Sequence, residues 1–192
     1  MRTGDIKVVK GPMFAGKTTH LTAIHDIAPD HVIAVRPGHD TRWGQLSTHD
    51  GKSIDSITVN TSSDIMRILN DGKTIHRILF DECHFYAPEL GMFSGDFISD
   101  IKFLSRQGID VYIFGLNRDW RGDTFPIMDR IESIASEVME LNGTCSLCGA
   151  PSCRTQRIVP GTGSYDVGAE DLYRPVCLSC FEAGFEKESV AA

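Results

Sequence analysis

One stretch constrains the fold of this chain more than any other, and it reads Gly11-Pro12-Met13-Phe14-Ala15-Gly16-Lys17-Thr18-Thr19. It fits G-x-x-x-x-G-K-[ST], a pattern whose backbone N–H groups surround phosphate oxygens, while the lysine reaches the β- and γ-phosphates and the hydroxyl binds Mg²⁺. Residues 6–9, just before it, predict a strand, and residues 18–25, just after it, predict a helix. A helix in this place points its N-terminus at the anion. A turn that binds nothing is the alternative, and the flanking elements favour a nucleoside triphosphate site instead.

Further apolar stretches alternate with helical patterns along the chain. Strands are predicted at 31–36, 77–82, 110–116 and 136–141, with a hairpin around Asp50-Gly51. Helices are predicted from Ser62 towards Gly72, within 88–107 with a break near Gly91 and Gly95, and at 125–135. Alternation of this kind implies an α/β fold, a mostly parallel sheet flanked by helices, with ligands beyond the carboxyl ends of the strands. The phosphate loop, Asp81-Glu82 and the loop from Asn117 all follow such ends, so one site is expected to collect them.

The acidic pair Asp81-Glu82 ends the apolar stretch that begins at Arg77. An acid in this position is the usual partner of a phosphate loop, because its carboxylate holds Mg²⁺ together with the hydroxyl of Thr18. Glu82 allows three readings: a base that accepts a proton from a hydroxyl, a base that orients water for ATP hydrolysis, or a solvated charge at a strand end. The residues alone leave these open.

Two cysteine pairs, Cys145-x-x-Cys148 and Cys177-x-x-Cys180, are separated by 28 residues. Two such turns supply the four thiolates of a tetrahedral, structural zinc site. The residues between the pairs are too polar and rich in glycine for a core of their own, so a loop that closes over a ligand is expected. A zinc ribbon that binds a partner is the alternative. Cys83 and Cys153 fall outside the pairs, and Cys83 is predicted to be a packing residue.

Length and charge narrow the class of protein. The 192 residues fit one medium domain with an appendage, and we predict a phosphate-loop domain at 1–141, a zinc-binding domain at 142–185 and a disordered tail at 186–192. The net charge of −7 argues against a broad nucleic-acid surface. No apolar run is long enough to span a membrane, and the chain enters its first predicted strand without a signal segment, so a cytoplasmic protein is expected.

Several short motifs occur in order across residues 6–181. They are Gly11 to Thr18, Asp40-Thr41-Arg42, Ser47-Thr48-His49-Asp50-Gly51, Asp81-Glu82-Cys83-His84-Phe85, Gly115-Leu116, Arg121-Gly122-Asp123-Thr124-Phe125, Cys145-x-x-Cys148-Gly149, Thr155-Gln156-Arg157, Val167-Gly168-Ala169-Glu170 and Tyr173-x-x-x-Cys177-x-x-Cys180. Each alone is weak, but the ordered set is specific. Through it the chain resembles the zinc-containing thymidine kinases of the cytosolic, type II class.

The resemblance implies transfer of the γ-phosphate of ATP to the 5′-hydroxyl of thymidine, with deoxyuridine as a secondary substrate. It implies that Glu82 is the general base, that Asp81 is the magnesium-site acid, and that Arg42 lies near the transferred phosphate. Lys17 and Thr18 match the phosphate-loop ligands. The family also implies a homotetramer and feedback inhibition by dTTP. The acidic net charge and the lack of a long apolar run predict no nucleic-acid or membrane partner. A kinase for another deoxynucleoside, or a zinc-ribbon ATPase acting on nucleic acid, remains as an alternative.

The nucleoside side of the site also follows from the resemblance. The loop between the cysteine pairs matches the family's lasso, which covers the nucleoside, and its matching contact positions are Thr155, Tyr173 and the backbone around Val167 and Gly168. The residues that match the family's apolar pocket around the base and sugar are Met13, Phe85, Leu116, Trp120 and Phe125. The chain departs from the family's usual residues at Cys83, His84, Asn117, Trp120, Thr124 and Ala169. None of these departures removes a catalytic group, but Trp120 and Ala169 bear on which base is accepted.

Overall fold

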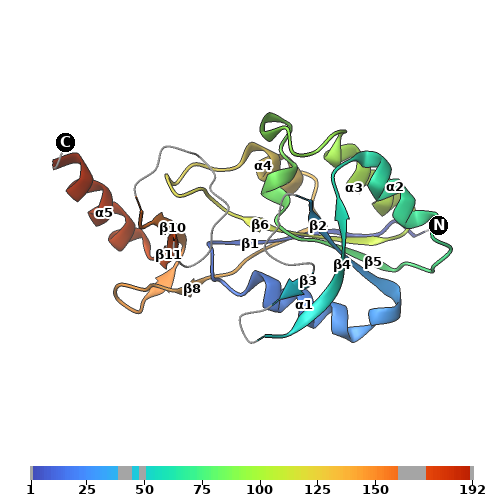
Figure 1. Cartoon of the computed structure of the whole chain (residues 1–192), viewed down its shortest axis with the longest axis horizontal. Coiled ribbons are helices and arrows are strands. Elements are labelled where there is room, and N and C mark those ends of the chain that lie inside the picture. The colour runs from blue at the N-terminus through green and yellow to red at the C-terminus, as the bar shows by residue number, and fades with distance from the viewer. Residues whose placement is uncertain (1, 39–44, 48–50, 160–171, 191–192) are drawn as a thin grey trace.

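A computed structural model describes residues 2–38, 45–47, 51–159 and 172–190, which form a helix-flanked sheet and a small C-terminal segment (Figure 1). The helices are α1 (Lys17–Ile27), α2 (Ser62–Leu69), α3 (Phe97–Arg106), α4 (Pro126–Glu132) and α5 (Leu178–Val190), with short 3₁₀ turns at Pro29–His31, Cys83–Tyr86 and Pro88–Leu90. The strands are β1 (Ile6–Gly11), β2 (Val32–Pro37), β3 (Gln45–Ser47), β4 (Ser53–Val59), β5 (Arg77–Phe80), β6 (Asp110–Leu116), β7 (Glu137–Glu140), β8 (Gly143–Thr144), β9 (Pro151–Ser152), β10 (Arg154–Arg157) and β11 (Tyr173–Val176).

The main sheet has the strand order β3-β4-β2-β5-β6-β1-β7. Every pairing from β4 to β7 is parallel, and only β3 runs antiparallel, against β4. The mostly parallel sheet predicted from the sequence is therefore confirmed. The predicted hairpin corresponds to β3 and β4, where Leu46 lies opposite Ile54, while residues 48–50 of its turn lie outside the described residues.

Each face of the sheet packs against its own helices because successive strand residues point to opposite sides. Val8 belongs to the larger apolar cluster, with residues of α2, α3 and α4, whereas Val9 belongs to the smaller cluster, with Leu21 of α1. In Figure 1 these three helices lie on one side of the sheet and α1 on the other. The sheet is thus covered on both faces, and its strand ends remain available for a site.

The structure differs from the sequence prediction within residues 88–107. Only Pro88–Leu90 and Phe97–Arg106 are helical, because the chain adopts positive φ angles at Gly91 (62°) and Gly95 (138°). Asp96 then starts α3, since its carboxylate accepts the N–H groups of Ile98 and Ser99. The break predicted at the two glycines is present. The helix that follows it, α3, covers only part of the predicted range 88–107.

In the C-terminal segment, residues 142–190, the described residues form two small two-stranded sheets, β8-β9 and β10-β11, followed by α5. The backbone of α5 continues to Val190, so residues 186–190 extend a helix where the sequence predicted a disordered tail. These residues include the helix formers Glu186, Lys187 and Glu188, and no proline interrupts them. Residues 160–171 of the predicted lasso lie outside the described residues.

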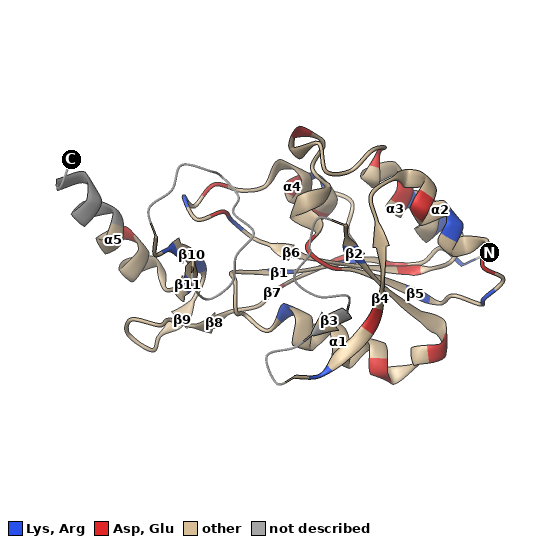
Figure 2. Ribbon diagram, viewed as in Figure 1, with Lys and Arg blue, Asp and Glu red and all other residues tan. Residues whose placement is uncertain are grey.

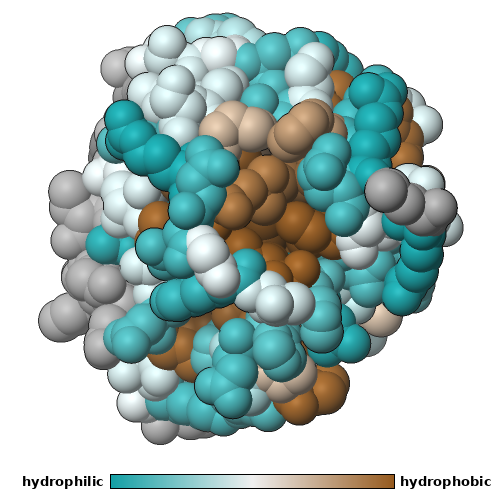
Figure 3. Space-filling model, turned by 90° about the vertical axis from the view of Figure 1, so that its right-hand side faces the viewer, coloured by the Kyte–Doolittle hydropathy of each residue, from teal (hydrophilic) through white to brown (hydrophobic). Residues whose placement is uncertain are grey.

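Charge and hydropathy are distributed unevenly. Figure 2 shows acidic residues on α2, α3 and β4, and basic residues on β10 and β11 of the C-terminal segment. Figure 3 shows the end of the molecule that carries the N-terminus, where hydrophobic residues gather at the centre and hydrophilic residues surround them. Within the described residues, no helix has both the length and the apolar character needed to cross a membrane.

Candidate functional site

The phosphate loop leads from β1 directly into α1. Gly16 precedes the helix with a φ of 79°, a left-handed conformation that glycine adopts at little cost, and no side chain caps the helix. The first intrahelical hydrogen bond runs from His20 N–H to the Gly16 carbonyl, so the N–H groups at the start of α1 have no partner within the helix. Gly11, at the other end of the loop, is crowded: a Cβ there would lie 2.4 Å from the Leu141 carbonyl oxygen. The loop therefore has the geometry of an anion site.

Lys17 is only 8% exposed, and its Nζ donates to the carbonyls of Pro12 (2.7 Å) and Gly11 (3.2 Å). An ammonium has three N–H donors, so the third is the one we expect to reach a phosphate. Burial lowers the pKa of Lys17, while the nearby carboxylates of Glu82 and Asp81 oppose that shift. Lysine and both acids therefore share one electrostatic environment.

The acidic pair lies just beyond β5, which ends at Phe80, two residues earlier than the predicted strand. Asp81 is 3% exposed, and its Oδ1 accepts the Glu82 N–H at 3.0 Å. Glu82 has φ 49° and ψ 43°, a left-handed conformation that costs a residue other than glycine about 1–3 kcal/mol. Strain of this kind is typical of functional sites. It also releases Glu82 from the strict alternation of a strand, which would point neighbouring side chains to opposite faces.

His84 lies beside Glu82 in the buried 3₁₀ turn. Its Nδ1 accepts the Leu116 N–H at 3.3 Å and lies 3.6 Å from Oε2 of Glu82. Nδ1 is therefore the acceptor nitrogen, and the proton of the neutral ring is assigned to Nε2. The rings of Phe85 and Phe125 lie with their centroids 4.2 and 4.8 Å from that of His84. Three of the predicted pocket residues, Phe85, Leu116 and Phe125, thus surround the residue next to the candidate base.

A second group of predicted site residues lies where the C-terminal segment meets the phosphate loop. Oγ1 of Thr155, on β10, accepts the Met13 N–H at 3.0 Å. Tyr173, on β11, is paired with Arg157 of β10, and the Arg157 guanidinium lies 5.6 Å from the centre of the Trp120 ring. Arg121 lies at 4.7 Å from the same ring. The indole at this position is thus in contact with two cations, a feature that the sequence prediction of an apolar pocket did not include.

The hydroxyl of Thr155 gives a direct test of this junction. We expect Thr155→Val to lower the free energy of unfolding by about 0.5–1.5 kcal/mol, because the part-buried Met13 N–H would lose its acceptor. Denaturant unfolding measures this loss. Thr22→Val is the matched control, since the hydroxyl of the buried Thr22 donates to the Thr19 carbonyl of the same helix and not, among the described residues, to the C-terminal segment. Equal effects of the two changes would contradict a special role for the Thr155 bond.

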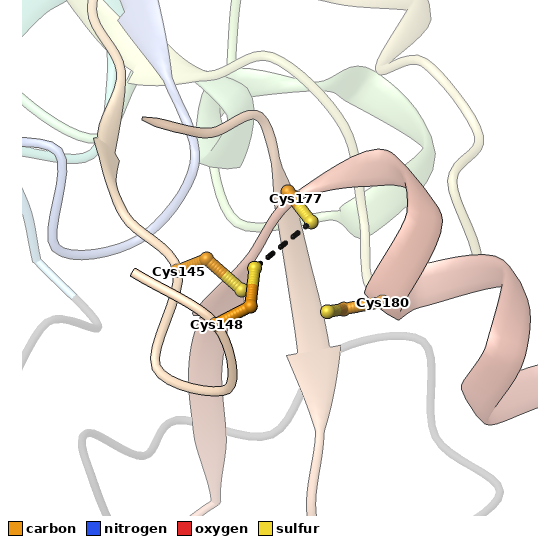
Figure 4. Close-up of side chains that lie close together, drawn as sticks. All are labelled: Cys145, Cys148, Cys177 and Cys180. Carbon is orange, nitrogen blue, oxygen red and sulfur yellow. Dashed lines mark hydrogen bonds between the residues drawn. The ribbon is translucent and has the colours of Figure 1, made fainter. Parts of the chain in front are cut away.

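The four paired cysteines converge on one point in the C-terminal segment (Figure 4). The sulfurs of Cys145, Cys148, Cys177 and Cys180 all lie within 4.8 Å of one another, and those of Cys148 and Cys177 are 3.6 Å apart. A tetrahedron of Zn–S bonds of about 2.3 Å places sulfurs about 3.8 Å apart, so this donor set fits zinc. Gly149 closes the first turn with a φ of 77°.

The environment of the sulfurs also favours a metal. Burial opposes ionisation of Cys145, but backbone N–H groups of Cys177, Leu147 and Cys148 donate to its sulfur and lower its pKa to about 6. The neighbouring sulfurs of Cys177 and Cys148 raise the pKa of Cys180 to about 12. Neighbouring sulfurs thus hinder one another from ionising. A bound divalent cation would offset this effect, because metal binding holds all four ligands as thiolates.

Some predicted residues lie outside this geometry. Arg42, Val167 and Gly168 are outside the described residues. Cys83 is fully buried and its Sγ donates to the Phe80 carbonyl at 3.2 Å, while burial raises its pKa, as expected for a packing residue. Asn117 was predicted to begin a loop at the site, but no role was predicted for its side chain or for Glu140, and the side chains of the two are hydrogen-bonded. A polar residue directly after an apolar strand, the signal used for Asp81, also marks Asn117.

Comparison with known proteins identifies one family. The family model described as Thymidine kinase matches residues 4–181. Among solved structures, the chain resembles one described as the structural basis for DNA unwinding at forked dsDNA by two coordinating Pif1 helicases, with 13% identity, a TM-score of 0.35 and coverage of 72% of this chain and 39% of that one. It also resembles Bacteroides Pif1 bound to ssDNA, with 14% identity, a TM-score of 0.35 and coverage of 72% and 38%. The chain thus spans about two-fifths of the length of those helicases.

Proposed function

The chain belongs to the thymidine kinase family, and from that premise we propose that it transfers the γ-phosphate of ATP to the 5′-hydroxyl of thymidine. A nucleoside kinase follows from the family. The choice of thymidine, with deoxyuridine as a secondary substrate, and the assignment of individual residues belong to the proposal. Inhibition by dTTP and assembly into a homotetramer are parts of the same proposal.

The phosphates of ATP would bind along residues 11–19. The loop backbone and the N–H groups at the start of α1 hold the oxygens, and Lys17 neutralises charge on the β- and γ-phosphates. Thr18 and Asp81 would hold Mg²⁺, whose charge, when bound, stabilises the transferring phosphoryl group. The buried position of Asp81 and its coulombic link to Lys17 support this assignment. Arg42 is proposed as a further phosphate contact.

Glu82 is proposed as the general base, accepting the proton of the 5′-hydroxyl as the hydroxyl oxygen attacks the γ-phosphorus, while the bond from that phosphorus to the β,γ-bridging oxygen breaks and ADP leaves. Phosphoryl transfer depends mainly on alignment and charge neutralisation, so the base contributes by orienting the hydroxyl as well as by taking its proton. The left-handed backbone at Glu82, which sets the direction in which the side chain leaves the chain, supports a role that needs a positioned carboxylate.

The nucleoside would lie between the rings of His84, Phe85 and Phe125 on one side and the C-terminal segment on the other. Phe85, Leu116, Trp120 and Phe125 supply apolar surface for the base and sugar, and Met13, Thr155, Val167, Gly168 and Tyr173 complete the pocket. The four cysteines would hold structural Zn²⁺ and so fix the ends of residues 149–176, which are proposed to exclude water as a competing acceptor.

The observation that carries this proposal is the shared environment of Lys17, Asp81 and Glu82 at a phosphate loop bonded to Thr155 of the cysteine-bearing segment. Purified protein, ATP and Mg²⁺ are incubated with each deoxynucleoside in turn, and we expect phosphorylation of thymidine above all others. Turnover of another deoxynucleoside in preference to thymidine would overturn the choice of substrate. ATP hydrolysis that depends on added DNA or RNA, without nucleoside phosphorylation, would overturn the reaction itself.

A further inference from the structure

Asn117, the residue that follows β6, contacts three separate parts of the chain and is 8% exposed. Its backbone N–H donates to the carbonyl of Gly11 at 3.3 Å. Its side-chain Nδ2 donates to Oε1 of Glu140 at 2.9 Å and to the carbonyl of Cys153 at 3.3 Å. Gly11 opens the phosphate loop, Glu140 ends β7, and Cys153 joins β9 to β10. One buried residue therefore connects the phosphate loop, the sheet edge and the C-terminal segment.

The partners of the Asn117 side chain dictate its chemistry. A carboxylate and a backbone carbonyl only accept hydrogen bonds, so the side chain between them has to donate two. An amide meets this requirement, whereas an ionised aspartate of the same shape would present acceptors to acceptors. Within the described part of the chain, Oδ1 of Asn117 is buried and has no hydrogen-bond partner. A buried acceptor left unsatisfied is costly, which indicates that the residue is kept for its two donors.

A single further hydrogen bond connects Cys153 with the residue next to the cysteine cluster. The Cys153 N–H donates to the carbonyl of Val176 at 3.1 Å, and Val176 immediately precedes Cys177. Two residues after Cys153, Oγ1 of Thr155 on β10 accepts the Met13 N–H. The C-terminal segment is thus bonded to the start of the phosphate loop at two points, through Asn117 and through Thr155.

We propose that Asn117 is a positioning residue, which holds the C-terminal segment in register with the phosphate loop, and that Glu140 makes an amide obligatory at this position. Only the kinetic consequence rests on the proposed function. If the C-terminal segment contributes Thr155 to the nucleoside pocket, loss of this register moves the acceptor hydroxyl relative to the phosphate. Misalignment of this kind lowers the rate of transfer more than the affinity for ATP.

The test is a double-mutant cycle in the zinc-loaded enzyme. N117D should lower kcat about tenfold while the KM for ATP stays within about twofold, because the phosphate loop itself is unchanged. E140Q alone should have a small effect. In N117D/E140Q the pair with residue 140 is restored with donor and acceptor exchanged, while the Cys153 carbonyl still lacks its donor, so kcat and Tm should recover only part of the loss. N117S, which is neutral but too short to reach Glu140, should lower kcat without recovery on addition of E140Q.

The control is N70D, the same chemical change at an exposed position after α2. The proposal is overturned if N117D behaves like N70D, or if the double variant is no better than N117D. If N117D does not fold, N117S decides instead, and a kcat and Tm equal to those of the unchanged enzyme would overturn the proposal. Should no nucleoside be phosphorylated by the unchanged enzyme, the proposed function fails, but the Tm values of the four proteins in the cycle still report whether Asn117 and Glu140 are coupled.

Discussion

Glu82→Gln is expected to lower kcat for thymidine phosphorylation by a factor of about 10²–10⁴, the contribution typical of a general base. The amide keeps the shape of the side chain but has no affinity for the proton of the 5′-hydroxyl. Binding of ATP should persist, because Lys17 and the loop backbone are unaffected and Lys17 loses only one of its two nearby carboxylates. Steady-state kinetics and calorimetric titration with ATP measure the two effects separately.

The matched control for this variant is Glu89→Gln, which removes a carboxylate from the nearby 3₁₀ turn at Pro88–Leu90, at an exposed position. Its activity should equal that of the unchanged enzyme. If Glu82→Gln retained comparable activity, Glu82 would be rejected as the base. If it lost ATP binding as well, the carboxylate would instead belong to the phosphate and metal site.

Cys177→Ser is expected to have the largest effect on the C-terminal segment. Structural zinc contributes about 10–16 kcal/mol of apparent binding free energy in isolated zinc-finger peptides, and loss of one thiolate removes a quarter of the ligand set. Zinc affinity should fall by at least about 10–100-fold, the range seen even for outer-shell partners. The KM for thymidine should rise, because β11 ends at the residue before Cys177 and carries Tyr173.

Elemental analysis measures the zinc content of the Cys177→Ser protein, and limited proteolysis measures how well its C-terminal segment is protected. Cys153→Ser serves as the control. Cys153 lies in the same segment but outside the cysteine quartet, and its link to Asn117 uses the backbone carbonyl, so serine should preserve both zinc and activity. A Cys177→Ser protein that kept its zinc and its affinity for thymidine would contradict a closed four-thiolate site. Loss of zinc in both variants would mean that the quartet is not the whole site.

Most of the sheet was predictable because its strands are continuous apolar runs. Strand β6 was predicted with its observed limits, Asp110 to Leu116, since a polar residue or a turn bounds it at each end. The convergence of Asp81, Glu82 and Lys17 was predictable too, because parallel strands bring their carboxyl ends to one edge of the sheet. The cysteine quartet followed from spacing alone, and the structure brings all four sulfurs together.

What the sequence did not predict depends on contacts between distant residues. The left-handed backbone at Glu82 has no local signal, because only Gly, Asn and Asp commonly mark such a conformation. The amide required at Asn117 depends on Glu140, 23 positions away, and on a backbone carbonyl that no sequence pattern reveals. The two cations beside Trp120 come from a neighbouring residue and from β10, so an indole expected among apolar residues has a different environment.

The two glycines of the phosphate loop are constrained by different physics. A side chain at position 16 would meet no atom within 4 Å, so only the handedness of the backbone favours glycine there. At position 11 the obstacle is the Leu141 carbonyl, which belongs to the chain leaving β7, so closure of the sheet edge sets that choice. Two independent constraints therefore favour the two glycines: lack of space at position 11 and a left-handed backbone at position 16. Its first glycine would be conserved by folding even in a descendant that had stopped binding nucleotides, and only its second glycine reports on the anion.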